Sequence, residues 1–154
     1  MVLAIYGWQI LRTPGTFRWL DSLDLAIHEA GHVFIPGPLG GTLAQLIIPT
    51  LFVVALWRQG DRHGATVPLW WLGQNCWNIA VYAKDARAQE LPLVGGGEHD
   101  WALLLGEAGL LHRDLAIGNA IALAGFLLYA AAIIFGVRAL AAPRQPPPTS
   151  AMLD

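Results

Sequence analysis

The order of apolar and polar positions along the chain predicts a protein built of helices. An apolar and aromatic segment comes first, at 1–18, and is broken at Pro14-Gly15. Four longer apolar stretches follow, separated by proline, glycine or charged residues. They predict helices at 19–35, 39–57, 65–83 and 115–137. Each stretch is about as long as a helix needs to be to cross the apolar core of a bilayer.

One long connection, at 84–114, interrupts this pattern before the last helix. Within it, 101–112 has a helical pattern but is too short to span, which predicts an extra helix at the membrane interface. The end of the chain is different in kind, because four prolines fall within 143–148. We therefore expect a single membrane domain at 1–138 and a proline-rich, disordered tail at 139–154.

Two of the predicted helices carry polar residues at helical spacing. In the first helix the stripe is Asp21, Asp24, His28 and His32. Such a stripe cannot face lipid, so it must face protein, water or a metal. In the third helix the stripe is Gln74 or Asn75, then Asn78, Tyr82 and Asp85. For its amides we expect hydrogen bonds between helices.

Composition agrees with a membrane location. Hydrophobic residues make up 55% of the chain and charged residues only 13%, about half the usual share in soluble domains. Several of the seven tryptophans fall near the ends of apolar stretches, where membrane interfaces favour them. The net charge of −2 offers no basic patch for nucleic acid, and the one cysteine, Cys76, excludes an intramolecular disulfide. We expect an all-α, integral membrane bundle of about four helices, surrounded by lipid.

The most specific chemical pattern is His28-Glu29-Ala30-Gly31-His32. On a helix, two histidines four residues apart lie one turn apart on the same face, where both can bind one ion. Glu29 is then placed as the general base of a zinc hydrolase. The Ala-Gly pair between them is small enough to allow another backbone or a ligand close by. The same histidines could instead be hydrogen-bonded core residues or porphyrin ligands.

A catalytic zinc ion has three protein ligands and an open fourth position. Asp85 is the favoured third ligand, because it ends the polar stripe of the third helix. His99 is the next candidate, since it follows three glycines that would let the loop fold back over the motif. Asp100 is a further alternative, or a partner of one imidazole.

With four crossings, the N-terminus, the loop at 58–64 and the C-terminal tail share one side of the membrane. Six cations belong to that side: Arg12, Arg18, Arg58, Arg62, Arg138 and Arg144. Three belong to the other: Lys84, Arg87 and Arg113. The excess of positive charge predicts cytoplasmic N- and C-termini, with the histidine motif opening to the exterior or periplasm.

A helix with HEAGH in a membrane is similar to the site-2-protease type of intramembrane zinc metallopeptidases. From His28 to Trp101 the chain more closely resembles a family of small, uncharacterised bacterial integral membrane proteins. The segments that carry this resemblance are HEAGH at 28–32, PLWWLGQN at 68–75, YAKDARA at 82–88, LPLVGGG at 91–97 and EHDW at 98–101. It implies a bacterial inner-membrane protein. The wider resemblance implies zinc on His28 and His32, Glu29 as general base and a distant aspartate.

The proteases carry that aspartate in a Leu-Asp-Gly motif, whereas this chain has Val94 at the corresponding place. The resemblance therefore supports a metal more than a peptidase. Two functions are expected: a zinc metallopeptidase acting on a peptide or membrane-protein substrate, or a small accessory or assembly subunit of a larger membrane complex without hydrolytic activity.

Overall fold

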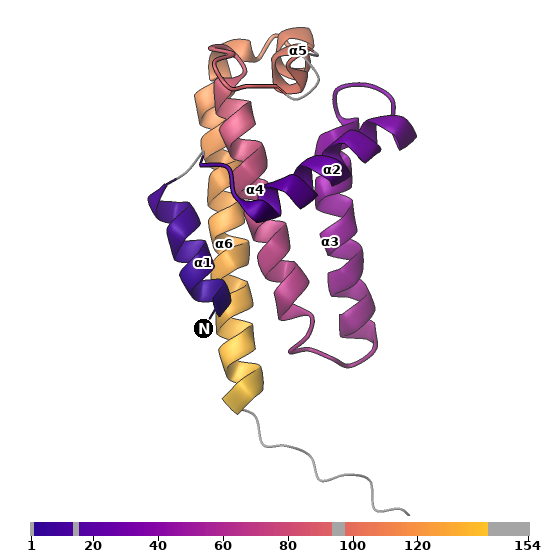
Figure 1. Cartoon of the computed structure of the whole chain (residues 1–154), viewed down its shortest axis with the longest axis vertical. Helices are drawn as coiled ribbons and strands as arrows, with labels where there is room; N and C mark the ends of the chain where they lie inside the picture. Colours follow the sequence, from indigo (N-terminus) through magenta and orange to yellow (C-terminus); the bar gives the residue numbers. More distant parts are fainter. Residues whose placement is uncertain (1, 14–15, 94–97, 142–154) are drawn as a thin grey trace, which may run out of the picture.

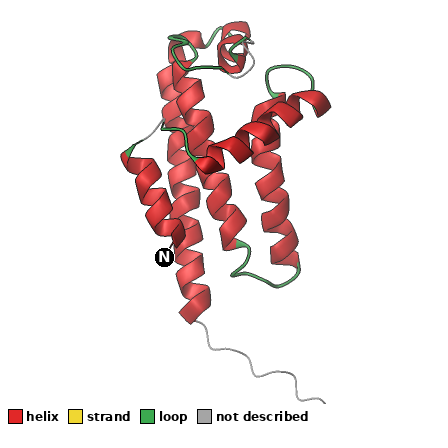
Figure 2. Ribbon diagram, in the orientation of Figure 1, coloured by secondary structure: helices red, strands yellow, loops and turns green. Residues whose placement is uncertain are grey.

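A computed structural model describes residues 2–13, 16–93 and 98–141. These residues form six α-helices and one short 3-10 helix, and no strand occurs among them (Figure 2). The elements are α1 (Val2–Arg12), α2 (Trp19–Phe34), α3 (Gly40–Arg58), α4 (Thr66–Asp85), α5 (Asp100–Glu107), η2 (Leu111–Arg113) and α6 (Asp114–Ala141). The all-helical prediction is confirmed. The predicted tail lies mostly outside the described residues, and α6 extends three residues into its range.

Within the described part of the chain, two helices are long and apolar enough to cross a membrane, namely α3 and the stretch Leu111–Ala141 that contains α6. The four-helix membrane bundle is therefore not confirmed. α4 has 20 residues, but it carries buried Gln74 and Asn75 among its apolar residues. α2 has only 16 residues and carries the aspartate–histidine stripe. Polar residues are costly within a bilayer, so the polar residues of α2 and α4 make these two helices weaker candidates for membrane spans.

Three of the helices form a layer, and another helix lies across it. α3, α4 and α6 run side by side, whereas α2 lies across them and α1 lies along α6 (Figure 1). The sharp turn from α2 into α3 has a local cause: Pro36 and Pro38 prevent the helix from continuing, and Gly37 adopts a φ of 98° that favours glycine. A side-chain carbon on Gly31 would overlap the carbonyl of Gly40, so this close crossing requires glycine in the HEAGH motif.

Small residues also bring α4 and α6 together. A side-chain carbon on Gly73 would lie 2.9 Å from the carbonyl oxygen of Gly125, and one on Gly125 would lie 2.8 Å from that of Gly73. Such contacts are typical of helices that pack without a large apolar core between them. Below them, Trp70 and Tyr129 stack edge to face with centroids 5.2 Å apart. Trp70 also donates a hydrogen bond to the Leu3 carbonyl, which ties α1 to the bundle.

Asp24 is the most deeply buried charged group in α2, with no exposed surface. Its Oδ1 accepts a hydrogen bond from the Trp71 indole at 2.8 Å, while its Oδ2 has no partner. Burial raises the pKa of Asp24 to about 6, more than the hydrogen bonds from Trp71 and Gln74 lower it. The folded protein therefore binds a proton at this site over a pH range in which the unfolded chain has lost it.

We predict that Asp24→Asn stabilises the protein at neutral pH and not at pH 4. Because the folded-state pKa lies above the unfolded value of 3.8, stability falls as pH rises from about 4 to 6. One pKa unit corresponds to about 1.4 kcal/mol, so the ionised Asp24 costs about 3 kcal/mol at pH 7.5. Thermal unfolding in detergent at several pH values measures the difference between variant and wild type.

Asp114→Asn is the matched control, because Asp114 is also buried but is paired with Arg87 at 3.0 Å. Removing that charge leaves Arg87 without its partner, so this variant should be destabilised at pH 7.5. A gain in stability from Asp24→Asn that is the same at pH 4 and pH 7.5 would contradict the assigned cause.

Candidate metal centre

Two histidines from α2 and one aspartate from α5 converge on one point. Nε2 of His28 lies 2.9 Å from Oδ2 of Asp100 and 3.1 Å from Nε2 of His32. The third side of the triangle, from Nε2 of His32 to the same Asp100 oxygen, is 3.1 Å. Ligand atoms that share a tetrahedral zinc ion at about 2.0–2.1 Å lie roughly 3.3 Å apart. The three atoms therefore stand close to the spacing that one ion requires.

The sequence supports this geometry at two places. On α2, the four-residue interval brings the two rings onto one face, with centroids 4.9 Å apart. On α3, Gly41 lies against the His28 ring, and a side-chain carbon there would overlap the ring atoms. A glycine at the start of α3 thus makes the space that the first histidine occupies.

The second nitrogen of each ring determines which nitrogen carries the proton. Nδ1 of His32 lies 3.1 Å from the carbonyl oxygen of Gly37, which can only accept a hydrogen bond. Nδ1 of His28 lies 3.0 Å from Oε1 of Gln45, which is also an acceptor. Both Nδ1 atoms therefore donate. In a neutral imidazole this leaves a lone pair on Nε2, the atom that faces Asp100.

Two lone pairs and a carboxylate oxygen that face one another repel, unless a cation or a proton lies between them. The donor set of two imidazole nitrogens and one carboxylate oxygen fits zinc. A proton is the other way to satisfy it. Burial lowers the pKa of His28, but hydrogen bonds to Asp100 and Gln45 and the charges of Asp100 and Glu29 outweigh it, so that the pKa is raised. The site favours positive charge.

Asp85 and His99 lie beside this cluster without joining it. The Asp85 carboxylate accepts hydrogen bonds from the backbone of Glu90 and Leu91 and so closes the turn after α4. Nε2 of His99 lies 3.4 Å from Asp85 Oδ2, while Nδ1 of His99 accepts from the Ala102 backbone at the start of α5. The structure thus brings Asp100, and not the favoured Asp85 or His99, to the two histidines. The other two residues hold the helix that presents it.

Glu29 lies on the wall of a cavity of about 540 Å³ that also includes His28, His32 and Asp100. Its side chain is exposed, whereas the three ligand residues are only partly so. Apolar side chains form much of the remaining wall, among them Phe17, Leu25, Trp101 and Leu103. The wall of the cavity therefore combines the three candidate metal ligands and Glu29 with apolar side chains.

Sequence reasoning did not include Gln45 among the site residues. It is a lone amide in an otherwise apolar helix and is 2% exposed. That signal is available in the sequence, because a buried amide needs a partner. Which partner it finds depends on the crossing of α2 over α3, which the sequence does not display.

Comparison with protein-family models, with curated proteins and with solved structures gives no match for this chain. The functional argument therefore depends on the site itself.

We predict that the purified protein binds one zinc ion through His28, His32 and Asp100. His28→Ala and Asp100→Asn should lose the metal, because each removes one of three ligand atoms. Asp85→Asn should still bind zinc, although more weakly than wild type, since Asp85 closes the turn that supports α5 but supplies no ligand atom. Elemental analysis of detergent-purified protein, prepared without chelator, measures zinc per chain. Loss of zinc from Asp85→Asn and not from Asp100→Asn would reverse the assignment.

Proposed function

We propose that this chain is a membrane-embedded zinc metallohydrolase, and most specifically a peptidase. The observation that carries the proposal is the convergence of two imidazole nitrogens and a carboxylate oxygen, all within 3.1 Å of one another, on the wall of a cavity that also holds Glu29. Bound zinc would supply Lewis acidity and would lower the pKa of a coordinated water to about 7. His28, His32 and Asp100 would hold the ion and leave its fourth position facing the cavity.

Glu29 is the proposed general base. It lies next to His28 in sequence and lines the same cavity as the three candidate ligands. In the exposed position that it has, its carboxylate can accept a proton from an attacking water and return it to the leaving group. Phe17 and Trp101, which also line the cavity, would bind an apolar side chain of the substrate and exclude bulk water.

The charges of the cavity wall favour an uncharged amide over a phosphate ester. Among its described lining residues, all the Asp, Glu, Lys and Arg side chains are carboxylates: Asp21, Glu29, Glu98 and Asp100. No lysine or arginine is available there to bind an anionic group, as phosphate recognition requires. A neutral peptide bond beside an apolar side chain suits this environment better.

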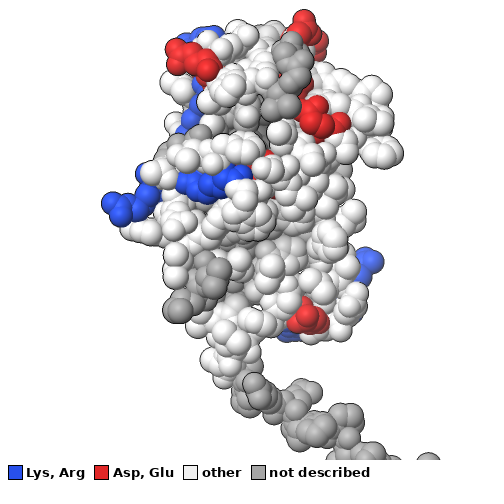
Figure 3. Space-filling model, viewed as in Figure 1, with Lys and Arg blue, Asp and Glu red and all other residues white. Residues whose placement is uncertain are grey.

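A membrane location is supported by the outer surfaces of α3 and α6. Large apolar side chains are exposed along both helices: Leu51, Phe52 and Trp57 on α3, and Leu123, Phe126, Leu127 and Phe135 on α6. On the face shown in Figure 3, acidic side chains gather at the α5 end and most of the remaining surface is uncharged. Apolar surface of this extent favours lipid over water. We propose that α3, α4 and α6 cross the bilayer, with the polar face of α4 turned inward.

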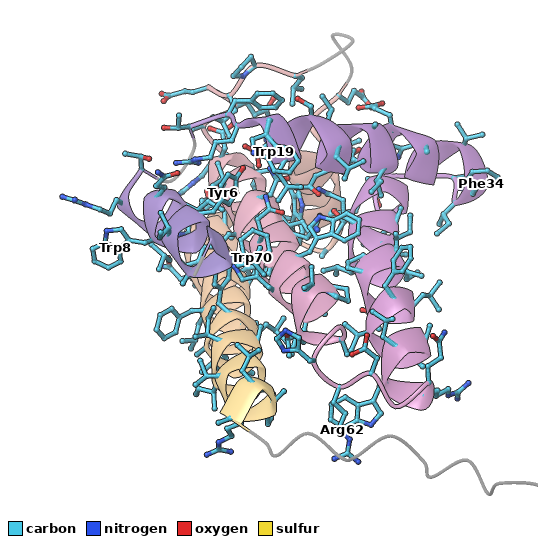
Figure 4. All side chains as sticks on the ribbon, turned by 60° about the horizontal axis from the view of Figure 1, so that its bottom comes forward. Tyr6, Trp8, Trp19, Phe34, Arg62 and Trp70 are labelled. Atoms are coloured by element: carbon cyan, nitrogen blue, oxygen red, sulfur yellow. The ribbon has the colours of Figure 1, made fainter. Side chains whose placement is uncertain are left out.

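In this arrangement α2 is an interfacial helix and not a span. It crosses the start of α3 and the middle of α4, and Phe34 at its far end projects away from the other helices (Figures 1 and 4). Trp19 and Phe34 are its terminal residues. Both are largely exposed, at 72% and 82%. Amphipathic helices of this kind lie in the plane of the membrane with their apolar side chains among the lipids. The metal centre would then lie at the membrane surface.

A crosswise α2 also changes the charge count on which the predicted orientation depends. Arg12 and Arg18 precede α2 and move to the side of the metal centre. That side then carries Arg12, Arg18, Lys84, Arg87 and Arg113, against Arg58, Arg62, Arg138 and Arg144 on the other. The excess that favoured cytoplasmic termini disappears.

We predict that Glu29→Gln retains zinc and loses hydrolysis. Removing a general base typically lowers the rate by 10²–10⁴-fold, and the amide keeps the size of the side chain. The protein in liposomes would be incubated with a mixture of peptides of defined sequence, and products would be identified by mass spectrometry. Zinc-stripped wild type is the control for cleavage by contaminants.

Equal cleavage by the zinc-loaded variant and wild type would refute the role of Glu29. Zinc binding without any zinc-dependent cleavage would favour the accessory-subunit function.

We predict that Arg12 and Glu107 lie on one side of the membrane and Arg62 on the other. Each position would carry a single cysteine in a Cys76→Ala background and would be labelled in intact vesicles with a maleimide that does not cross membranes. A crosswise α2 places residue 12 with residue 107. If α2 instead crosses the bilayer, residue 12 will be labelled with residue 62. The labelled side also gives the orientation.

A further inference from the structure

Gln45 connects the metal centre to a buried chain of polar groups. Its Oε1 accepts the hydrogen bond from Nδ1 of His28 at 3.0 Å, and its Nε2 donates to Oδ1 of Asn78 at 3.1 Å. Asn78 belongs to α4 and donates in turn to Oδ1 of Asp21 at 3.4 Å. The chain of bonds thus leaves α2 at His28, passes through α3 and α4, and returns to α2 at Asp21.

Asp21 sets the direction of every bond in this chain. Its Oδ2 accepts from the Arg18 backbone at 2.6 Å, and its Oδ1 accepts from the Gln74 amide at 3.0 Å. In its ionised form the Asp21 carboxylate only accepts hydrogen bonds, so it cannot donate to Asn78. Asn78 must therefore turn its NH₂ group toward Asp21 and its oxygen toward Gln45. Gln45 must then turn its oxygen toward His28.

We propose that Asp21, Asn78 and Gln45 form an orienting relay that keeps the proton of His28 on Nδ1 and directs its Nε2 lone pair at the metal. They are positioning residues, since none of them contacts the ion. The inference depends on the proposed zinc centre and extends it, because it assigns a function to the amide stripe of α4 that the sequence associates only with helix packing. Partners of this kind, one bond removed from the ion, commonly change metal affinity 10–100-fold.

The two histidines are oriented by different devices. His32 donates to the carbonyl of Gly37 in the turn that follows α2, a local contact five residues away. His28 depends on side chains from α3 and α4, which reach it only when the three helices are packed together. An amide relay also avoids a second carboxylate directly beside His28, in a buried place where an unpaired charge would be costly. Loss of the amide relay should therefore disturb the orientation of the His28 ring and leave that of His32 unchanged.

The test compares zinc affinities of buried amide variants in the full-length protein. Gln45→Met removes the acceptor and keeps the length of the side chain, so zinc affinity should fall about 10–100-fold. Gln45→Glu still accepts from His28 but places a carboxylate oxygen against the Asn78 oxygen, so its zinc affinity should lie between those of Gln45→Met and wild type. Gln74→Met is the matched control, because Gln74 donates to the same Asp21 oxygen but does not lie between Asp21 and His28. It should bind zinc as wild type does. Competition with a chromophoric zinc chelator in detergent measures each affinity.

A second readout follows the proton itself. In zinc-loaded wild type, the Nδ1 proton of His28 should give a slowly exchanging NMR signal, and Gln45→Met should abolish it while the corresponding signal of His32 remains. Wild-type affinity in Gln45→Met would overturn the relay and leave the zinc centre intact. An equal loss in Gln74→Met would also overturn it, since general loosening of the buried amides would then explain the effect. Absence of zinc from wild type would instead overturn the centre and, with it, the relay.

Discussion

The convergence of two imidazole nitrogens and a carboxylate oxygen, which favours positive charge between them, is the constraint that α2 and α5 meet together. Nε2 of His28, Nε2 of His32 and Oδ2 of Asp100 lie within 3.1 Å of one another, and neighbouring acceptors hold the protons of both rings on the far side. Such a cluster is stable only around positive charge. Three features of the fold bring these atoms together: the crosswise α2, the glycines where it meets α3, and the short α5.

Polar groups in this protein form a connected system and not a set of isolated pairs. Asp21 caps the start of α2, receives two amides from α4 and sets the direction of the bonds that reach His28. Asp85 and His99 similarly close the turn after α4 and the start of α5, and so hold Asp100 in place. In an environment with little water each of these groups needs a protein partner, because an unsatisfied one would be expensive. The cluster of candidate metal ligands and the helix packing are therefore parts of one network.

The local features of the fold were predictable from sequence, and the crossing of α2 was not. Proline and glycine between apolar stretches indicate where helices end, so the main helices lie within a few residues of the predicted ranges. The histidine interval places both rings on one face whatever surrounds the helix. By contrast, the choice of Asp100 over Asp85 depends on how the connection after α4 folds. Backbone N–H groups of that connection occupy the Asp85 carboxylate, and helical spacing alone carries no information about them.

Gln45 and the orientation of α2 were missed for a related physical reason. A polar stripe shows that a helix is partly buried, but it does not show whether the helix lies along its neighbours or across them. The length of 16 residues and the charges of α2 were the available signals against a span. The hydrogen bond between Gln45 and His28 exists only because α2 passes over α3, so the sequence of α3 alone does not predict it.

The position of Asp100 gives a bound ion a mechanical role. Asp100 begins α5 and follows His32 by 68 positions, so an ion held by both would join two distant parts of the chain. With its single cysteine, the chain has no intramolecular disulfide available for such a cross-link. By the chain-entropy estimate for a closed loop of this length, a comparable cross-link is worth on the order of 4 kcal/mol. The ion would act as a reversible cross-link between α2 and α5. A partner or chelator that removed the ion would release α5 from α2, while α3, α4 and α6 stayed assembled.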